Sequence, residues 1–512
     1  MATQSQIVRS KASQNPVSSL QGVNRAWGSR GCAPAGFAAI IALGGCAVGP
    51  DFSAPARPTE QAYLVDPTTA LGAPGRGEVA QRLALGAPLR ADWWTGMGSD
   101  TLNQTVALAL DNNKTLGIAR ANLARAAEQV AVERGGLYPQ VDADGGVGRR
   151  QYGASFLGPE AYTFPVFSSY TGGVTVSYDM DIFGGTRRRI ELAAADAEVG
   201  AEAMNAARLA VAGDTVMTAL QIASVRAQID VVQNVVESDE QNLKLVQTAN
   251  ASGVATRIDV TTAQSQLDRD RALLPPLHQQ RNVAEDALAI LVGKAPATWK
   301  APAFSLTAMT LPRDIPLAVP ANLVRARPDI RAAEAQLHAA SAQIGIATAD
   351  LYPRITLSAD VAGEGLISGP AGAAWSLMGG LAAPIFHGGA LQAKRRAAED
   401  AYHAAFAQYQ QTVLAAFQQV ADNLHGLSNS ADAVQAEQQA LDSANSALGL
   451  ARLGYGVGNA GVVQVLDAQR LQQLAELNLV QARIQRYVRT VNLFLAAGGG
   501  IAEPAPQVAS AK

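Results

Sequence analysis

The sequence is poor in aromatic residues, in charge and in long apolar runs. Aromatic side chains make up 5% of the 512 residues and charged side chains 16%, whereas 48% are hydrophobic, with alanine prominent among them. The absence of any run of about 20 apolar residues excludes a permanent transmembrane helix. The net charge of −3 provides no basic surface that could hold nucleic acid. Alanine favours helices but fills a wide core poorly, so we expect long helices rather than a globular domain.

The sequence also lacks the residue patterns that carry catalysis. Its five histidines show no spacing typical of metal ligands. It contains no phosphate-binding loop, no nucleophile elbow and no closely spaced pair of cysteines. His387, at an expected strand–helix junction, is better explained by a structural role. We therefore expect no enzyme activity, no metal site and no bound cofactor.

The N-terminus has the order of a secretory signal peptide. Arg25 and Arg30 precede a short, interrupted apolar stretch that ends in small residues before Cys46. These residues resemble the bacterial lipoprotein box, which implies that Cys46 carries a covalent lipid and becomes the first mature residue. Ala47, rather than an aspartate, follows it, and by the same resemblance this favours the outer membrane. The alternative is a buried cysteine that happens to follow two glycines.

Two further features of this region bear on its processing. The first 22 residues are polar and long for a signal, so one interpretation is that translation begins near Val23. Cys32 would then be lost with the signal, which leaves Cys46 alone and predicts no disulfide. Residues 46–90 are rich in proline, glycine and alanine, which indicates an extended tether.

An internal repeat organises the rest of the chain. Apolar residues recur at steps of seven in one segment and again 214 positions later, and a Tyr-Pro pair follows each set. The first set is Leu116, Leu123, Val130 and Leu137 before Tyr138 and Pro139, and the second is Ile330, Leu337, Ile344 and Leu351 before Tyr352 and Pro353. A seven-residue apolar step predicts helices that pack side by side. The proline then ends each helix.

Each half also contains a long stretch without proline, residues 186–274 and 389–503. A glycine-containing break interrupts each stretch, at 253–260 and 458–465. The limb before each break, about 65 residues long, would run roughly 100 Å as a helix. Each half is therefore predicted to be a helix, a strand hairpin and a long helical hairpin. The expected parts are a signal with any extra N-terminal extension over 1–45, a lipid-anchored linker over 46–90, a first repeat over 91–319, a second repeat over 320–500, and a disordered tail over 501–512.

Between the helices, apolar and polar residues alternate with period two. The polar set comprises Asp142, Asp144, Thr175, Ser177, Asp179, Thr356, Ser358 and Asp360. One interpretation is an antiparallel sheet whose polar face meets water outside a soluble core. The other is a membrane barrel, apolar towards lipid and polar towards a lumen. The long alanine-rich helices leave the apolar face nothing but lipid to pack on, which favours the barrel and assigns the polar set to its lumen.

The number of strands predicts an oligomer. One hairpin in each half gives four strands, which cannot close a barrel, and an open sheet edge is not tolerated in hydrocarbon. Three chains give 12 strands, wide enough for an aqueous passage, whereas two give eight, which side chains would fill. The fold class expected is therefore mainly α with a membrane β part. We expect a homotrimeric 12-stranded β-barrel continuous with a 12-helix α-barrel, each chain being built of two structural repeats.

Several segments resemble the TolC/OprM-like outer-membrane efflux channels, in their lipoprotein branch. They are residues 46–52, the Trp93-Trp94 pair, residues 323–334 and residues 465–470, and the resemblance covers nearly all of 46–499. It implies a lipid-anchored homotrimer in the outer membrane of a Gram-negative bacterium, extending into the periplasm. It also implies a periplasmic adaptor protein and an inner-membrane transporter of the proton-driven RND type as partners, with multidrug export as the associated activity.

In such channels the helical turns furthest from the membrane form a closable iris. The resemblance maps gate positions onto Asp467, Asp259 and Tyr455, with Arg452 and Arg257 near the turns as partners. Gln464 stands where relatives carry a second acid, so fewer ionic links are expected here. In a trimer, one aspartate on the axis becomes a ring of three carboxylates, which attracts cations. The alternative for Asp467 and Asp259 is a solvated helix face or a charge at a helix N-terminus.

Three other functions are alternatives to the export of small molecules. An enzyme lacks its site residues, and a structural coiled-coil protein would explain the seven-residue steps but not the alternating strands. A channel for type I protein secretion is the nearest alternative. The lipoprotein box and the segment around Arg327, Pro328 and Asp329 favour solute efflux. The sequence does not indicate the exported compound.

Overall fold

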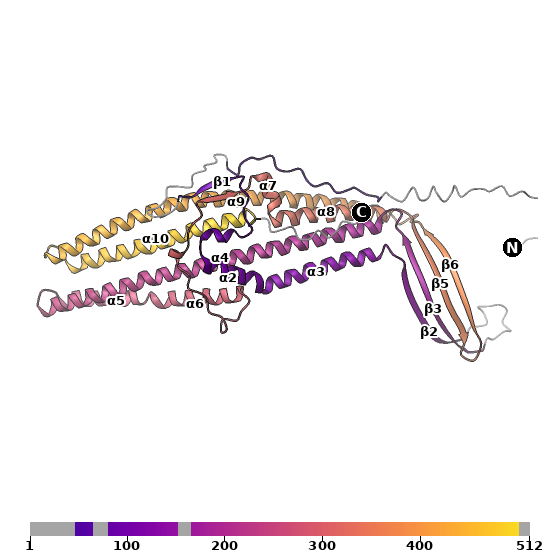
Figure 1. Cartoon of the computed structure of the whole chain (residues 1–512), viewed down its shortest axis with the longest axis horizontal. Coiled ribbons are helices and arrows are strands. Elements are labelled where there is room, and N and C mark those ends of the chain that lie inside the picture. Colours follow the sequence, from indigo (N-terminus) through magenta and orange to yellow (C-terminus); the bar gives the residue numbers. More distant parts are fainter. Residues whose placement is uncertain (1–46, 65–79, 152–164, 501–512) are drawn as a thin grey trace, which may run out of the picture. The chain divides into compact units, whose positions relative to one another are not determined.

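Residues 47–64, 80–151 and 165–500 are described by the computed structural model (Figure 1). The expected signal peptide, the lipidated Cys46 and the C-terminal tail lie outside the described residues, so these stay predictions.

The two halves of the chain show the same order of elements. The first half contains α2 (Asp100–Asn112), α3 (Lys114–Gly135), β2 (Gln140–Arg150), β3 (Phe167–Met180), α4 (Gly185–Ala251), α5 (Arg257–Arg271) and α6 (Leu274–Leu291). The second contains α7 (Pro320–Ala326), α8 (Pro328–Ala349), β5 (Arg354–Leu366), β6 (Ala371–Ala382), α9 (Ala390–Gly456) and α10 (Val462–Ala496). The predicted repeat of helix, strand hairpin and helical hairpin is thus present in the fold.

The helices with seven-residue steps form α3 and α8. Asn113 caps α3, because its side-chain oxygen accepts from the backbone N–H groups of the first turn. Leu116 and Val130 of α3 are buried, as are Ile330 and Leu337 of α8. The last member of each predicted series, Leu137 and Leu351, lies beyond the helix end in the turn before the Tyr-Pro pair.

The long helices α4 and α9 have 67 residues each, close to the expected length. The chain then reverses at Gly253 and Gly458, whose φ angles of 75° and 81° lie in the left-handed region that favours glycine. The returning limbs differ. In the first half the limb is divided into α5 and α6, because Pro275 has no N–H to bond to the carbonyl of Arg271 and its ring crowds that carbonyl. In the second half α10 runs unbroken for 35 residues.

A small two-stranded sheet was not expected. Strand β1 (Arg82–Leu85), inside the predicted tether, pairs in parallel with β4 (Asp314–Leu317), and an ion pair joins Arg82 to Asp314. The tether is therefore extended but partly hydrogen-bonded. Its earlier part also packs: the backbone N–H of Val48 donates to the carbonyl of Phe183 (3.0 Å), and the ring of Phe52 stacks on His338 at 4.4 Å.

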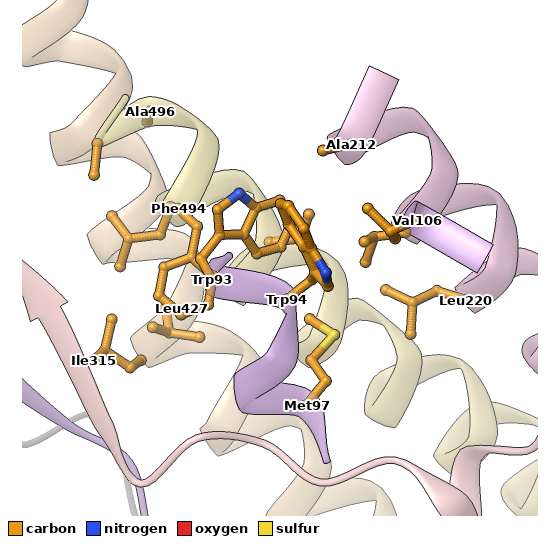
Figure 2. Packing of buried hydrophobic residues seen from close by; sticks show 14 of the residues in the cluster. Trp93, Trp94, Met97, Val106, Ala212, Leu220, Ile315, Leu427, Phe494 and Ala496 are labelled. Atoms are coloured by element: carbon orange, nitrogen blue, oxygen red, sulfur yellow. The ribbon is translucent and has the colours of Figure 1, made fainter. Parts of the chain in front are cut away.

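The main apolar core lies where α2, α4, α9 and α10 meet around the Trp93-Trp94 pair (Figure 2). The two indoles are in edge contact at 5.7 Å, and Trp93 packs on Phe494 of α10 at 5.4 Å. Val106, Ala212 and Leu220 contribute from α2 and α4. Burying large aromatic rings of this kind contributes about 1.5–3 kcal/mol each by area. Among the described residues, no helix has the length and apolarity needed to cross a membrane.

Strands β2, β3, β5 and β6 form one antiparallel sheet in that order, joined directly to the helices (Figure 1). Strand β3 connects the two halves by pairing with β5. Strands β2 and β6 are the outer strands, and within the described chain each has one edge without a partner strand.

Candidate functional site

The first candidate site is the polar face of the four-stranded sheet. Directly paired residues of an antiparallel sheet point to the same face. The register pairs Asp142 with Thr175 and Thr175 with Asp360, and the same alternation carries the rest of the predicted polar set. All eight residues therefore share one face: Asp142, Asp144, Thr175, Ser177, Asp179, Thr356, Ser358 and Asp360. Ser376 of β6 joins this face and donates a hydrogen bond to Asp360.

The opposite face of the same sheet is apolar and exposed. Its members include Val141, Val147, Val174, Leu357, Val361, Trp375, Leu377 and Leu381. Trp375, for example, is 78% exposed. A contiguous exposed apolar surface of this kind is typical of a contact with a membrane or with another protein. The sequence did not indicate that β6 contributes to this apolar face. The residues of β6 on the polar face are mostly small, such as Gly380 and Ala382, so the strand shows no alternation of apolar and polar residues.

The second candidate site is the turn end of the helical hairpins, where the predicted gate residues lie. Asp467 on α10 is 67% exposed at its side chain and is 3.9 Å from Arg470, one turn further on. Arg452 on α9 donates to Ser238 on α4 (3.3 Å), so it links the two hairpins of the chain. Tyr455 packs between the hairpins, against the apolar cluster that includes Val246 of α4.

Asp259 and Gln464 both serve local helix caps. Asp259 accepts from the backbone N–H and the hydroxyl of Thr256 (2.8 and 2.7 Å), and these bonds hold its pKa below the usual range. This is the capping box of α5. Gln464 accepts from the backbone N–H of Gly461 at 2.6 Å, at the start of α10. The local geometry of Asp259 is thus that of a charge at a helix N-terminus, which was the alternative to a gating role.

A buried carboxyl pair next to these residues was missed from the sequence. Asp239 on α4 and Asp270 on α5 are only 2% and 5% exposed. Gln469 of α10 donates to Asp239 (2.7 Å), and Gln473 of α10 donates to Asp270 (3.3 Å). Burial and the neighbouring carboxyl of Asp270 raise the pKa of Asp239 to about 7. The pair joins three helices from both hairpins, because α10 contacts both carboxyls.

The sequence contains one pattern that indicates the buried position of Asp239. Asp239 lies on the apolar stripe of Val232, Val235 and Val246, at steps of three, four and seven residues, which places a carboxyl on the packed face of the helix. The stripe alone did not show which residue would face it, because Asp270 comes from a separate helix.

Comparison with known proteins gives the family. The sequence profile of the outer membrane efflux protein family matches residues 105–294 and 319–499. Outer membrane protein OprJ of Pseudomonas aeruginosa is 30% identical over 471 residues, covering 90% of this chain and 94% of its own. Toluene efflux pump outer membrane protein TtgF of Pseudomonas putida is 29% identical over 484 residues, covering 91% and 96%.

Solved structures show the same fold. The CmeC outer membrane channel of Campylobacter jejuni superposes with a TM-score of 0.79, covering 90% of this chain and 97% of its own, at 21% identity. The two segments of the profile match lie one in each half of the duplicated fold. The chain belongs to the outer membrane efflux protein family.

Proposed function

We propose that three copies of this chain form the outer-membrane conduit of a tripartite efflux pump, which receives small molecules from an inner-membrane transporter of the RND type through a periplasmic adaptor. One observation carries this proposal: a four-stranded sheet with a polar face and an exposed apolar face, whose two outer edges have no partner strand among the described residues, is joined directly to long helical hairpins. Family membership supports it, as does the relative TtgF, which is named as the outer membrane protein of a toluene efflux pump.

Physical reasons favour this assembly. An apolar sheet face can lie in lipid only if every strand edge is paired, because an unpaired backbone group in hydrocarbon costs several kcal/mol. Copies of the chain would supply partners for the edges of β2 and β6 and enclose the polar face. The lumen would then carry carboxylates of Asp142, Asp144, Asp179 and Asp360 in every copy. A covalent lipid on Cys46 would add a second anchor, as the lipoprotein box implies.

The proposed gate lies at the turn end of the hairpins. The exposed carboxylate of Asp467 is free to face an axis shared by three copies, and Arg452 and Tyr455 link or pack the two hairpins of one copy. Exposed charged pairs contribute only about 0–1 kcal/mol each. Three copies together would still hold a closed state that a docked adaptor could release.

The test is single-channel conductance of the purified protein in lipid bilayers. We expect channels from the wild type and a changed conductance or cation selectivity for Asp467→Ala, because a ring of three negative charges is removed. Asp111→Ala, an exposed carboxylate of α2 away from the turns, is the matched control and should behave as wild type. Equal conductance of Asp467→Ala and wild type would remove Asp467 from the gate. No channels from the wild type would contradict the conduit itself.

A further inference from the structure

A groove of about 350 Å³ lies between α4 and α10, level with the middle of α4. Its walls combine polar and apolar side chains from the two helices: Asp214, Met217, Thr218, Gln221, Ser224, Ile484, Gln485 and Val488. Among these described residues, Asp214 is the only one that carries a charge. Sites for small molecules measure about 300–1,000 Å³ and combine apolar walls with a few polar groups. This cavity, which we call the Asp214 groove, has that size and composition.

The polar side chains of the Asp214 groove have few partners within the chain. Among the described residues, no hydrogen bond or ion pair reaches the carboxylate of Asp214, and desolvation by the surrounding helices raises its pKa. The side-chain amides of Gln221 and Gln485 likewise have no hydrogen-bond partner in the described part of the chain. Arg483 and Arg486 of α10 donate instead to glutamines on α9 and in the segment before β1. A partly desolvated carboxylate without an ion-pair partner favours the approach of a cation.

The groove lies on the side of α4 that is opposite to the main apolar core. Ala212 and Val216 belong to that core, and Asp214 lies two residues from each, about 200° around the helix. On a further side α6 packs against α4, where Arg226 donates to Glu285 (3.2 Å), and α10 packs beside the groove. The core side is closed by α2 and cannot line an open passage, whereas Asp214 is open to solvent. In the proposed conduit the groove therefore faces the lumen.

We propose that the Asp214 groove binds amphipathic organic cations during their passage through the helical part of the conduit. This inference rests on the proposed conduit and adds a class of cargo to it. The carboxylate of Asp214 attracts the positive charge, and the amide oxygens of Gln221 and Gln485 accept from its N–H groups. Met217 and Val488 contact the apolar part of the molecule. Binding is weak because the groove is open to water, and a conduit needs sites that also release what they bind.

Block of single-channel current by a small cation tests the site with the full-length protein in planar lipid bilayers. The probe is 2-phenylethylammonium, which combines an ammonium group with an aromatic ring. Two controls each lack one of these parts: 2-phenylethanol has no charge, and methylammonium has no apolar part. We expect 2-phenylethylammonium to block the wild type at a several-fold lower concentration than methylammonium, and 2-phenylethanol to give no block. Equal block by the two cations would show attraction by charge alone and would overturn the site.

Substitutions that remove or add one negative charge locate the block. Asp214→Asn should raise the half-blocking concentration of 2-phenylethylammonium several-fold, because the amide keeps the size of the side chain but not its charge. Gln221→Glu adds a second carboxylate one to two turns away on the same face and should lower that concentration several-fold. Asp111→Asn, at an exposed position of α2 on the far side of the core, is the matched control and should block as the wild type does.

The same measurements in an Asp467→Asn background separate the groove from the proposed gate. If the groove binds the probe, Asp214→Asn weakens the block in this background by the same factor as in the wild type. Channels whose block is unchanged by Asp214→Asn in both backgrounds would overturn the site and leave the conduit intact. A wild type that forms no channels would instead overturn the conduit, and the groove would then line no lumen.

Discussion

The role of each aspartate near the turns of the helical hairpins depends on its surroundings. Asp467 is exposed on a helix, Asp259 is held in a capping box, and Asp239 is buried beside Asp270. Three aspartates near the same turns therefore lie in three different surroundings. Burial and a second carboxyl both disfavour the charged form of Asp239 and raise its pKa to about 7.

The raised pKa of Asp239 predicts a pH-dependent stability. Its pKa is about 7 in the folded protein against 3.8 for an ordinary aspartate, so the folded state keeps a proton that the unfolded state has lost. The free energy of unfolding should therefore fall as the pH rises from about 4 to about 7, and the penalty should be complete above 7. Asp239→Asn should remove this contribution, because an amide cannot ionise and can still donate to Asp270.

Thermal unfolding followed by circular dichroism at pH 5, 6, 7 and 8 tests this. The melting temperature of Asp239→Asn should exceed that of the wild type at pH 8, and the difference should shrink towards pH 5. Asp268→Asn, an exposed aspartate of α5, should show no such trend. A constant difference across the pH range would show that Asp239 carries no proton at neutral pH.

At the scale of elements, the helical hairpins depend on the conformation of their turns. Gly253 has a φ of 75° and its added Cβ would meet no atom within 4 Å, so the cost of replacing it is one of backbone strain alone. Gly253→Ala should destabilise the protein by about 1 kcal/mol, the cost of a left-handed conformation for an L-residue. Gly449→Ala is the matched control: it too meets open space but lies within α9.

In the control, alanine should stabilise the helix by roughly 0.5–1 kcal/mol relative to glycine. Denaturant unfolding of both variants against the wild type measures the two effects, and they should have opposite signs. The same sign for both would mean that the turn at Gly253 tolerates alanine, and that the glycine there is not required by its φ angle.

At the scale of the whole molecule, two anchors would hold the protein in the membrane. The apolar sheet face is part of the fold, whereas a lipid on Cys46, predicted from the lipoprotein box, would be a separate attachment. Cys46→Ser should therefore abolish incorporation of radiolabelled palmitate but leave the protein in the carbonate-resistant membrane fraction. Cys32→Ser should leave labelling unchanged. Release of Cys46→Ser by carbonate would show that the lipid, and not the sheet, is the main anchor.

The sequence by itself determined the repeated order of elements, the helix ends and the two faces of the sheet. It could do so because seven-residue steps, proline and two-residue alternation act locally. Only the tertiary structure decided that the four strands form one sheet and that β1 pairs with β4. It alone also brought Asp239, Asp270 and Gln469 together, because contacts between residues far apart in the chain depend on packing that no local pattern records.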